Sequence, residues 1–186
     1  MKQQGAPRVV KKNFTLRTIQ SRGHAWQFLE TSDSATILIY IRDTDQVLLV
    51  RQRRDAMVRD DNPEGWITES MGGRFDREEQ VRQLLAREAS EEVGGTIDPS
   101  TIVLLNDGAP MALSAGCLVE RAWLGYVEIT SDQLEQADRE YGLAEEGERI
   151  TRVFLPAREV ESYVCEDVRV FALLQWFLRM NVDDRR

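Results

Sequence analysis

The chain has 186 residues, of which 42% are hydrophobic, and a formal net charge of -8. This length and composition are sufficient for one substantial core, so we expect one main domain rather than a repeat array. Because the chain is acidic and has no basic stripe, the sequence argues against a nucleic-acid partner and against binding to an anionic membrane.

The redox compartment is predicted from Cys117 and Cys165, the only cysteines in the chain. Two cysteines are too few for a disulfide framework, and the polar start MKQQGAPRVVKK lacks the apolar core of a signal peptide. No apolar run approaches membrane-spanning length. We therefore expect a soluble, reduced, cytoplasmic protein.

Four β-rich stretches come first along the chain, at residues 13–20, 25–31, 35–41 and 46–51. The first two are expected to form an N-terminal antiparallel strand pair, and the last two a hairpin across residues 42–45. We divide the chain into an N-terminal strand extension, residues 1–34, and a main domain, residues 35–186.

A helix is predicted over residues 77–93, where Val81, Leu84 and Leu85 form an apolar stripe. Glu88 and Glu92 continue that stripe, since helical residues four apart share a face. Two acids at this spacing repel each other, and a divalent cation held by oxygen ligands would remove the conflict. The same acids also fit a charged, solvated helix face. Asp76 with Glu79 fits an N-terminal capping box, and Gly94 with Gly95 fits a C-cap.

The rest of the chain alternates strands with helices, which predicts a mixed sheet covered by helices, an α/β sandwich. An amphipathic helix is expected to close the chain, with Phe171, Trp176 and Phe177 in the core or at an interface. Strands are expected at residues 102–105, 121–129 and 149–155, a helical or irregular segment at 132–140, a short helix at 157–163 after Pro156, and the closing helix at 167–180.

The predicted helix lies in a motif with a characteristic spacing: Gly73-x5-Glu79-x7-Arg87-Glu88-x2-Glu91-Glu92-x-Gly94. This spacing resembles the Nudix box. Three flanking segments extend the likeness, which covers roughly residues 13–180: VRQRRDAMVRDDNPEGWITESMGGRFD, SAGCLVER and GLAEEGERI. They are similar to segments of Nudix enzymes that hydrolyse ADP-ribose and GDP-mannose.

The resemblance implies the Nudix fold, a mixed β-sheet sandwiched between α-helices, with an N-terminal antiparallel strand extension. It implies a homodimer in which the N-terminal strands help to build the partner's site. The implied reaction is Mg2+-dependent cleavage of a nucleoside diphosphate sugar, with Mn2+ as a possible substitute. The products would be a nucleoside monophosphate and a sugar phosphate.

The resemblance also assigns roles to residues. It places the metal at Glu88 and Glu92, with Glu91, Glu148 and the backbone carbonyl of Gly72 as further ligands. It implies Glu146 as the catalytic base, and a carboxylate is expected in this role because the only histidine, His24, lies in the strand extension. Glu120, after the SAG segment, and Glu69, before the glycine turn, are secondary candidates. Arg87 is expected to pair with a box glutamate and fix its orientation. Substrate contacts are expected from Arg51, Arg54, Ser114, Gly116 and Glu120.

The segment SAGCLVER departs from the subfamily at Ala115, where the relatives have proline, so the sequence leaves the base and the sugar open. Two other functions stay open with them. One is hydrolysis of dinucleoside polyphosphates or damaged nucleotides at the same metal site. The other is a non-catalytic domain that binds a nucleotide metabolite.

Overall fold

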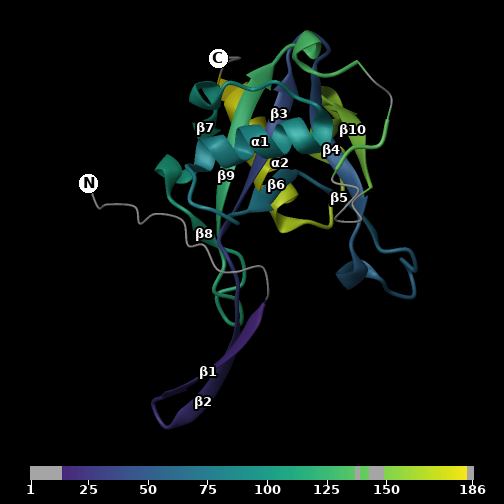
Figure 1. The fold of residues 1–186 in the computed structure, drawn as a ribbon. Coiled ribbons are helices and arrows are strands. Elements are labelled where there is room, and N and C mark those ends of the chain that lie inside the picture. Colours follow the sequence, from purple (N-terminus) through teal and green to yellow (C-terminus); the bar gives the residue numbers. More distant parts are fainter. Residues whose placement is uncertain (1–13, 137–138, 143–148, 184–186) are drawn as a thin grey trace.

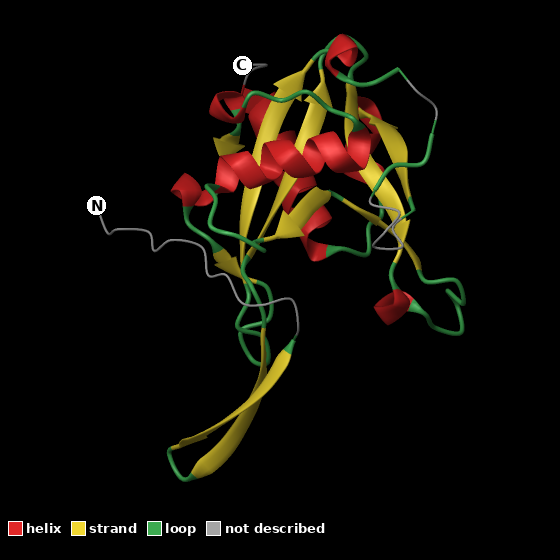
Figure 2. Ribbon diagram, viewed as in Figure 1, coloured by secondary structure: helices red, strands yellow, loops and turns green. Residues whose placement is uncertain are grey.

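The computed structural model describes residues 14–136, 139–142 and 149–183. A mixed eight-stranded sheet lies between two helices, α1 (Val81–Val93) and α2 (Val168–Asp183), as Figures 1 and 2 show. A separate two-stranded sheet projects from this body. The predicted α/β sandwich, with its sheet between helices, is confirmed.

The strands of the main sheet follow the order β10-β4-β3-β9-β7, in which β3 and β9 are parallel and the other pairs are antiparallel. Three short strands extend this path: β5 pairs with β4, β6 with β3 and β8 with β9. The bounds are β3 Ser34–Ile41, β4 Gln46–Arg53, β5 Trp66–Glu69, β6 Met71–Arg74, β7 Val103–Leu104, β8 Met111–Ala112, β9 Arg121–Ile129 and β10 Ile150–Pro156. Short 3-10 helices at Asp55–Met57, Pro99–Thr101, Asn106–Gly108, Ser131–Gln133 and Ala157–Ser162 connect them.

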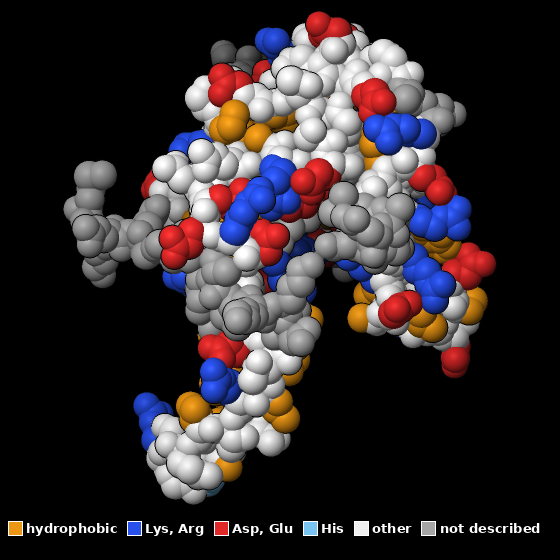
Figure 3. Space-filling view, in the orientation of Figure 1, with side chains coloured by type: hydrophobic (Ala, Val, Ile, Leu, Met, Phe, Trp, Pro, Cys, Tyr) orange, Lys and Arg blue, Asp and Glu red, His pale blue; other side chains and the backbone are white. Residues whose placement is uncertain are grey.

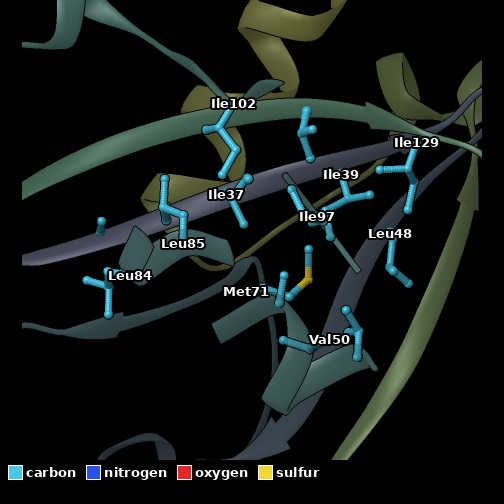
Figure 4. Close-up of a cluster of buried hydrophobic side chains, with 14 of the residues drawn as sticks. Ile37, Ile39, Leu48, Val50, Met71, Leu84, Leu85, Ile97, Ile102 and Ile129 are labelled. Atoms are coloured by element: carbon cyan, nitrogen blue, oxygen red, sulfur yellow. The ribbon is translucent and has the colours of Figure 1, made fainter. Parts of the chain in front are cut away.

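The central strand β3 is buried on both faces, which is why its second part, residues 37–41, is a continuous apolar run. Ile37 and Ile39 belong to the core beneath α1, shown in Figure 4, whereas Leu38 belongs to the core beneath α2. α1 contributes Leu84 and Leu85 to the first core. The two helices therefore cover opposite faces of one sheet.

Close packing of α1 depends on Gly125 in β9. A Cβ atom at this position would lie 2.7 Å from Cδ1 of Leu85. The glycine thus lets the helix approach the sheet, which fixes the distance between the helix and the strands beneath it.

The second core is formed by α2, with Val170, Leu173 and Phe177 buried. Trp176 is half-buried against it, whereas Phe171 is 55% exposed. The core, one of the two places predicted for these aromatic residues, is therefore wrong for Phe171, and its place at an interface stays a prediction. No helix among the described residues is both long and apolar enough to cross a membrane.

The start of α1 differs from the prediction. The helix begins at Val81 rather than at residue 77, and its N-cap is Gln80, whose N–H donates to the Gln83 side chain at 3.3 Å. The predicted capping box of Asp76 and Glu79 is therefore wrong, because Glu79 accepts a hydrogen bond from Arg87 instead. The predicted C-cap is confirmed: Gly94 has φ +60°, and the N–H of Gly95 donates to the carbonyl of Ala89.

The N-terminal strands β1 (Thr15–Ser21) and β2 (His24–Glu30) form the predicted antiparallel pair. This hairpin stands away from the body, and several of its large apolar side chains are exposed, as the orange atoms along it in Figure 3 show. Its base is attached to the segment before β9 through Leu29, which exchanges backbone hydrogen bonds with Cys117 and Val119. The exposed apolar residues are Phe14, Leu16, Ile19, Trp26 and Leu29.

Asp167 caps α2, since its carboxylate accepts from the N–H groups of Arg169 at 2.7 Å and Val170 at 3.0 Å. Although burial opposes its charge, these bonds and the Arg169 guanidinium lower the pKa of Asp167. A carboxylate whose pKa is lower in the folded state than in the unfolded state stabilises the fold at pH values above its unfolded-state pKa. This contribution is lost as the pH falls through the folded-state pKa.

Asp167→Ala is therefore expected to reduce the free energy of unfolding by about 1–2 kcal/mol at neutral pH. Its difference from wild type should shrink in acid. Urea unfolding across this pH range measures both effects. Glu161→Ala, which removes an exposed carboxylate from the preceding 3-10 helix, is the control. A difference that persists undiminished at low pH would contradict the assignment.

Candidate active site

Buried polar side chains gather around one cleft of about 640 Å³. All of the buried polar residues among those described line it, except Asp33 and Gln52. The walls come from the second half of α1, from β6, from β3 and from the start of α2. Buried polar groups carry a desolvation penalty, so their concentration in one place indicates a ligand site.

The box glutamates Glu88, Glu91 and Glu92 line this cleft together. Glu92 is 5% exposed, and its Oε2 accepts a hydrogen bond from the N–H of Gly72 at 3.1 Å. Glu88 lies against Gly73, where a side chain would meet its carboxylate. β6 thus holds the Glu92 carboxylate by a backbone hydrogen bond, and the missing side chain of Gly73 leaves room for the Glu88 carboxylate.

Alanine substitutions at the neighbouring glycines Gly72 and Gly73 are expected to have different effects. A Cβ at Gly72 would lie 2.7 Å from the backbone Cα of Thr36, so Gly72→Ala should destabilise the fold by about 1–3 kcal/mol. A Cβ at Gly73 would meet only the end of the flexible Glu88 side chain, so Gly73→Ala should lower kcat roughly 10-fold with little loss of stability. Thermal unfolding and initial rates on both variants measure the contrast, and equal stability losses would contradict it.

Arg87 joins the carboxylates of the box. Its NH1 lies 2.9 Å from Glu88 and 3.2 Å from Glu91, and its NH2 lies 3.0 Å from Glu79. Burial opposes the charge of the guanidinium, yet its hydrogen bond to Glu79 and the negative charges of Glu79, Glu88 and Glu91 raise the pKa of Arg87 above its ordinary value. The predicted pairing of Arg87 with a box glutamate is present in this geometry, and it extends to Glu79, which the sequence had suggested as a cap.

A second group of charges, centred on Glu69, faces the same cleft. Glu69 is 6% exposed and accepts from Arg54 Nε at 2.8 Å, from Gln52 at 2.8 Å and from Arg169 at 3.3 Å. Arg54 and Arg169 both line the cleft. The sequence analysis missed Arg169, because its place in the cleft depends on a partner 100 residues earlier in the chain.

Other predicted residues lie in different places. Glu120 lines the cleft and accepts from Ser34 at 2.5 Å. Arg51 does not line it; its guanidinium lies over the ring of Trp66 at 5.7 Å. Ser114 and Gly116 are exposed in the segment that holds the base of the hairpin, and they do not line the cleft of this single chain.

The predicted base Glu146 and the predicted ligand Glu148 lie outside the described residues. The described chain stops next to the box at Gly142, whose N–H donates to the carbonyl of Glu91 at 3.3 Å. It resumes with β10 at the neighbouring edge of the sheet.

The donor atoms of the cleft fit a hard divalent cation. Glu88, Glu92 and the backbone of Gly72 offer only oxygen ligands, which Mg2+ and Mn2+ prefer. Within the described ranges, no three acidic, histidine or cysteine side chains converge as a ready-made metal site. The close approach of the Glu88 carboxylate to Gly73 and the hydrogen bond from Gly72 to Glu92 nevertheless place both glutamates beside β6.

Comparison with known proteins agrees with this geometry. The family model described as NUDIX domain matches residues 32–174, which is most of the chain. No curated protein matches the sequence. The chain therefore belongs to the Nudix family, whose members hydrolyse pyrophosphate bonds in nucleoside diphosphate derivatives and generally use divalent metals such as Mg2+.

Proposed function

We propose that this chain is a Mg2+-dependent pyrophosphatase that cleaves a nucleoside diphosphate sugar, of the ADP-ribose or GDP-mannose type, into a nucleoside monophosphate and a sugar phosphate. The observation that carries the proposal is the cleft itself, where the box carboxylates of α1 and the arginine pair Arg54 and Arg169 line one cavity. The likeness of residues 50–76 and 114–121 to enzymes of this type supports the substrate class.

The charges of the cleft suit a diphosphate. When bound, a divalent ion neutralises phosphate oxygens and lowers the pKa of a coordinated water. Glu88 and Glu92 would hold that ion, and Arg87 keeps the box carboxylates oriented. Arg54 and Arg169 provide fixed positive charge for the phosphates, because Glu69 holds both guanidinium groups in place.

The base is proposed to be Glu146. Of the two secondary candidates, Glu69 already accepts hydrogen bonds from Gln52, Arg54 and Arg169, which suits it to positioning arginines rather than to taking a proton. Glu120 accepts from Ser34 and lies 3.9 Å from Arg74, so it stays the alternative within the described cleft.

A homodimer is part of the proposal. The projecting hairpin exposes Leu16 and Leu29 on one face and Ile19 and Trp26 on the other, and exposed apolar side chains of this kind favour a protein–protein contact. The segment holding Ser114 and Gly116 is attached to this hairpin, so a second copy could bring these residues to a cleft. Light scattering that shows only monomers at working concentration would contradict the dimer.

A substrate panel with product identification, in Mg2+ and in Mn2+, tests the function. It should include nucleoside diphosphate sugars, dinucleoside polyphosphates, oxidised nucleoside triphosphates and buffer alone. The proposal predicts the highest kcat/KM on a nucleoside diphosphate sugar. Preference for either of the other classes would favour the alternative hydrolase, and binding without cleavage of any member would favour the non-catalytic domain.

A further inference from the structure

The last turn of α1 is anchored from outside the helix. The final carbonyls of a helix have no partners within the helix. In α1 these carbonyls belong to the turn that carries Glu91 and Glu92. The carbonyl of Val93 accepts a hydrogen bond from NH2 of Arg152. The carbonyls of Glu91 and Gly94 accept from the N–H groups of Gly142 at 3.3 Å and Glu135 at 2.9 Å.

Arg152 is the only side chain among these three donors. It lies on β10, and its NH1 donates to the carbonyl of Glu135 at 2.7 Å, so one guanidinium bridges the end of α1 and the segment that follows β9. Its plane lies over the ring of Tyr141, with Cζ 4.3 Å from the ring centroid. Arg139 also contacts this ring, at 4.7 Å, but forms its ion pair with Glu135.

The charge of Arg152 suits this place, because a cation is favoured at the C-terminal end of a helix. Burial lowers the pKa of Arg152 from its ordinary value, yet an arginine stays charged at neutral pH. The guanidinium lies behind the last turn and does not line the cleft that contains Glu91 and Glu92. The effect on the metal site that we consider is therefore indirect, through the position of α1.

We infer that Arg152 is a positioning residue for the box glutamates. Its guanidinium bonds the Val93 carbonyl while it also bonds the Glu135 carbonyl and stacks on Tyr141, and it thereby sets the orientation of the last turn of α1. The inference rests on the proposed metal-binding role of Glu88 and Glu92. Without Arg152, the Val93 carbonyl keeps no donor among the bonds described above, so the turn carrying Glu91 and Glu92 loses one of its three anchors from outside the helix.

The test compares Arg152→Met, Arg152→Lys and Arg139→Met. Arg139→Met is the matched control, because it removes a guanidinium from the same tyrosine ring without removing a bond to α1. Mn2+ binding is measured by electron paramagnetic resonance without substrate, and hydrogen exchange is measured over residues 88–96. Arg152→Met should weaken Mn2+ binding roughly 10-fold and speed exchange in this segment. Arg152→Lys should recover part of both losses, since one ammonium can still reach one carbonyl.

Several outcomes would overturn the inference while leaving the proposed function in place. They are wild-type Mn2+ affinity in Arg152→Met, an equal loss in Arg139→Met, or no recovery in Arg152→Lys relative to the methionine variant. If Arg152→Met does not fold, the Mn2+ affinities of Arg152→Lys and Arg139→Met are compared instead. Weaker binding by Arg152→Lys supports the inference, and equal binding contradicts it. Failure of the wild-type protein itself to bind Mn2+ would contradict the proposed function instead.

Discussion

Glu92→Gln is expected to reduce kcat for diphosphate hydrolysis by roughly 10³-fold, because a neutral amide cannot hold a divalent cation as a carboxylate does. Glu92 is the most buried of the box glutamates that line the cleft. Glutamine has the same shape, and its amide oxygen can still accept the hydrogen bond from Gly72. The fold should therefore persist while activity is lost.

Rates at saturating Mg2+, together with thermal unfolding, measure this result. The matched control is Glu78→Gln, which makes the same chemical change at an exposed position outside the cleft and should leave turnover unchanged. A Glu92→Gln enzyme within a few-fold of wild-type turnover would exclude Glu92 as a principal ligand.

The second large effect is expected at Arg87. Its guanidinium contacts Glu79, Glu88 and Glu91 at once, through two different nitrogens. A lysine ammonium is a single point charge and cannot reproduce this geometry. Arg87→Lys should therefore weaken divalent-metal affinity by about 100-fold, although the net charge of the cleft is unchanged.

Direct Mn2+ titration of the substrate-free protein measures the loss. Arg82→Lys is the control, because Arg82 lies on the same helix but donates to the carbonyl of Ile102, away from the cleft. If Arg87→Lys binds Mn2+ as tightly as Arg82→Lys does, Arg87 acts only as a surface charge.

The parts of the fold that the sequence predicted best are those with strong periodicity. The stripe of Val81, Leu84 and Leu85 located α1, and the run at residues 121–129 located β9 with its bounds. The box spacing placed Glu88, Glu91 and Glu92 on one segment, and the structure places all three along one cleft. Whether they bind metal stays a prediction.

The features missed by the sequence analysis depend on partners far along the chain. β5, β6 and β8 are too short, and β6 too rich in glycine, to show an alternating pattern, so they form only by pairing with β4, β3 and β9. Arg169 reaches the cleft because α2 packs on the sheet, and its partner Glu69 lies 100 residues earlier. Glu79 looked like part of a helix cap because of its spacing from Asp76, whereas its hydrogen bond from Arg87 depends on where α1 begins.

The most direct test of the central claim is a phosphorus-31 NMR time course of ADP-ribose and GDP-mannose with purified protein, with Mg2+ and with chelator. Cleavage between the two phosphates replaces the diphosphate resonances with those of two monophosphate esters. We predict this replacement for at least one of the substrates, only when Mg2+ is present. Diphosphate resonances that persist in Mg2+, or conversion that continues in excess chelator, would contradict the account.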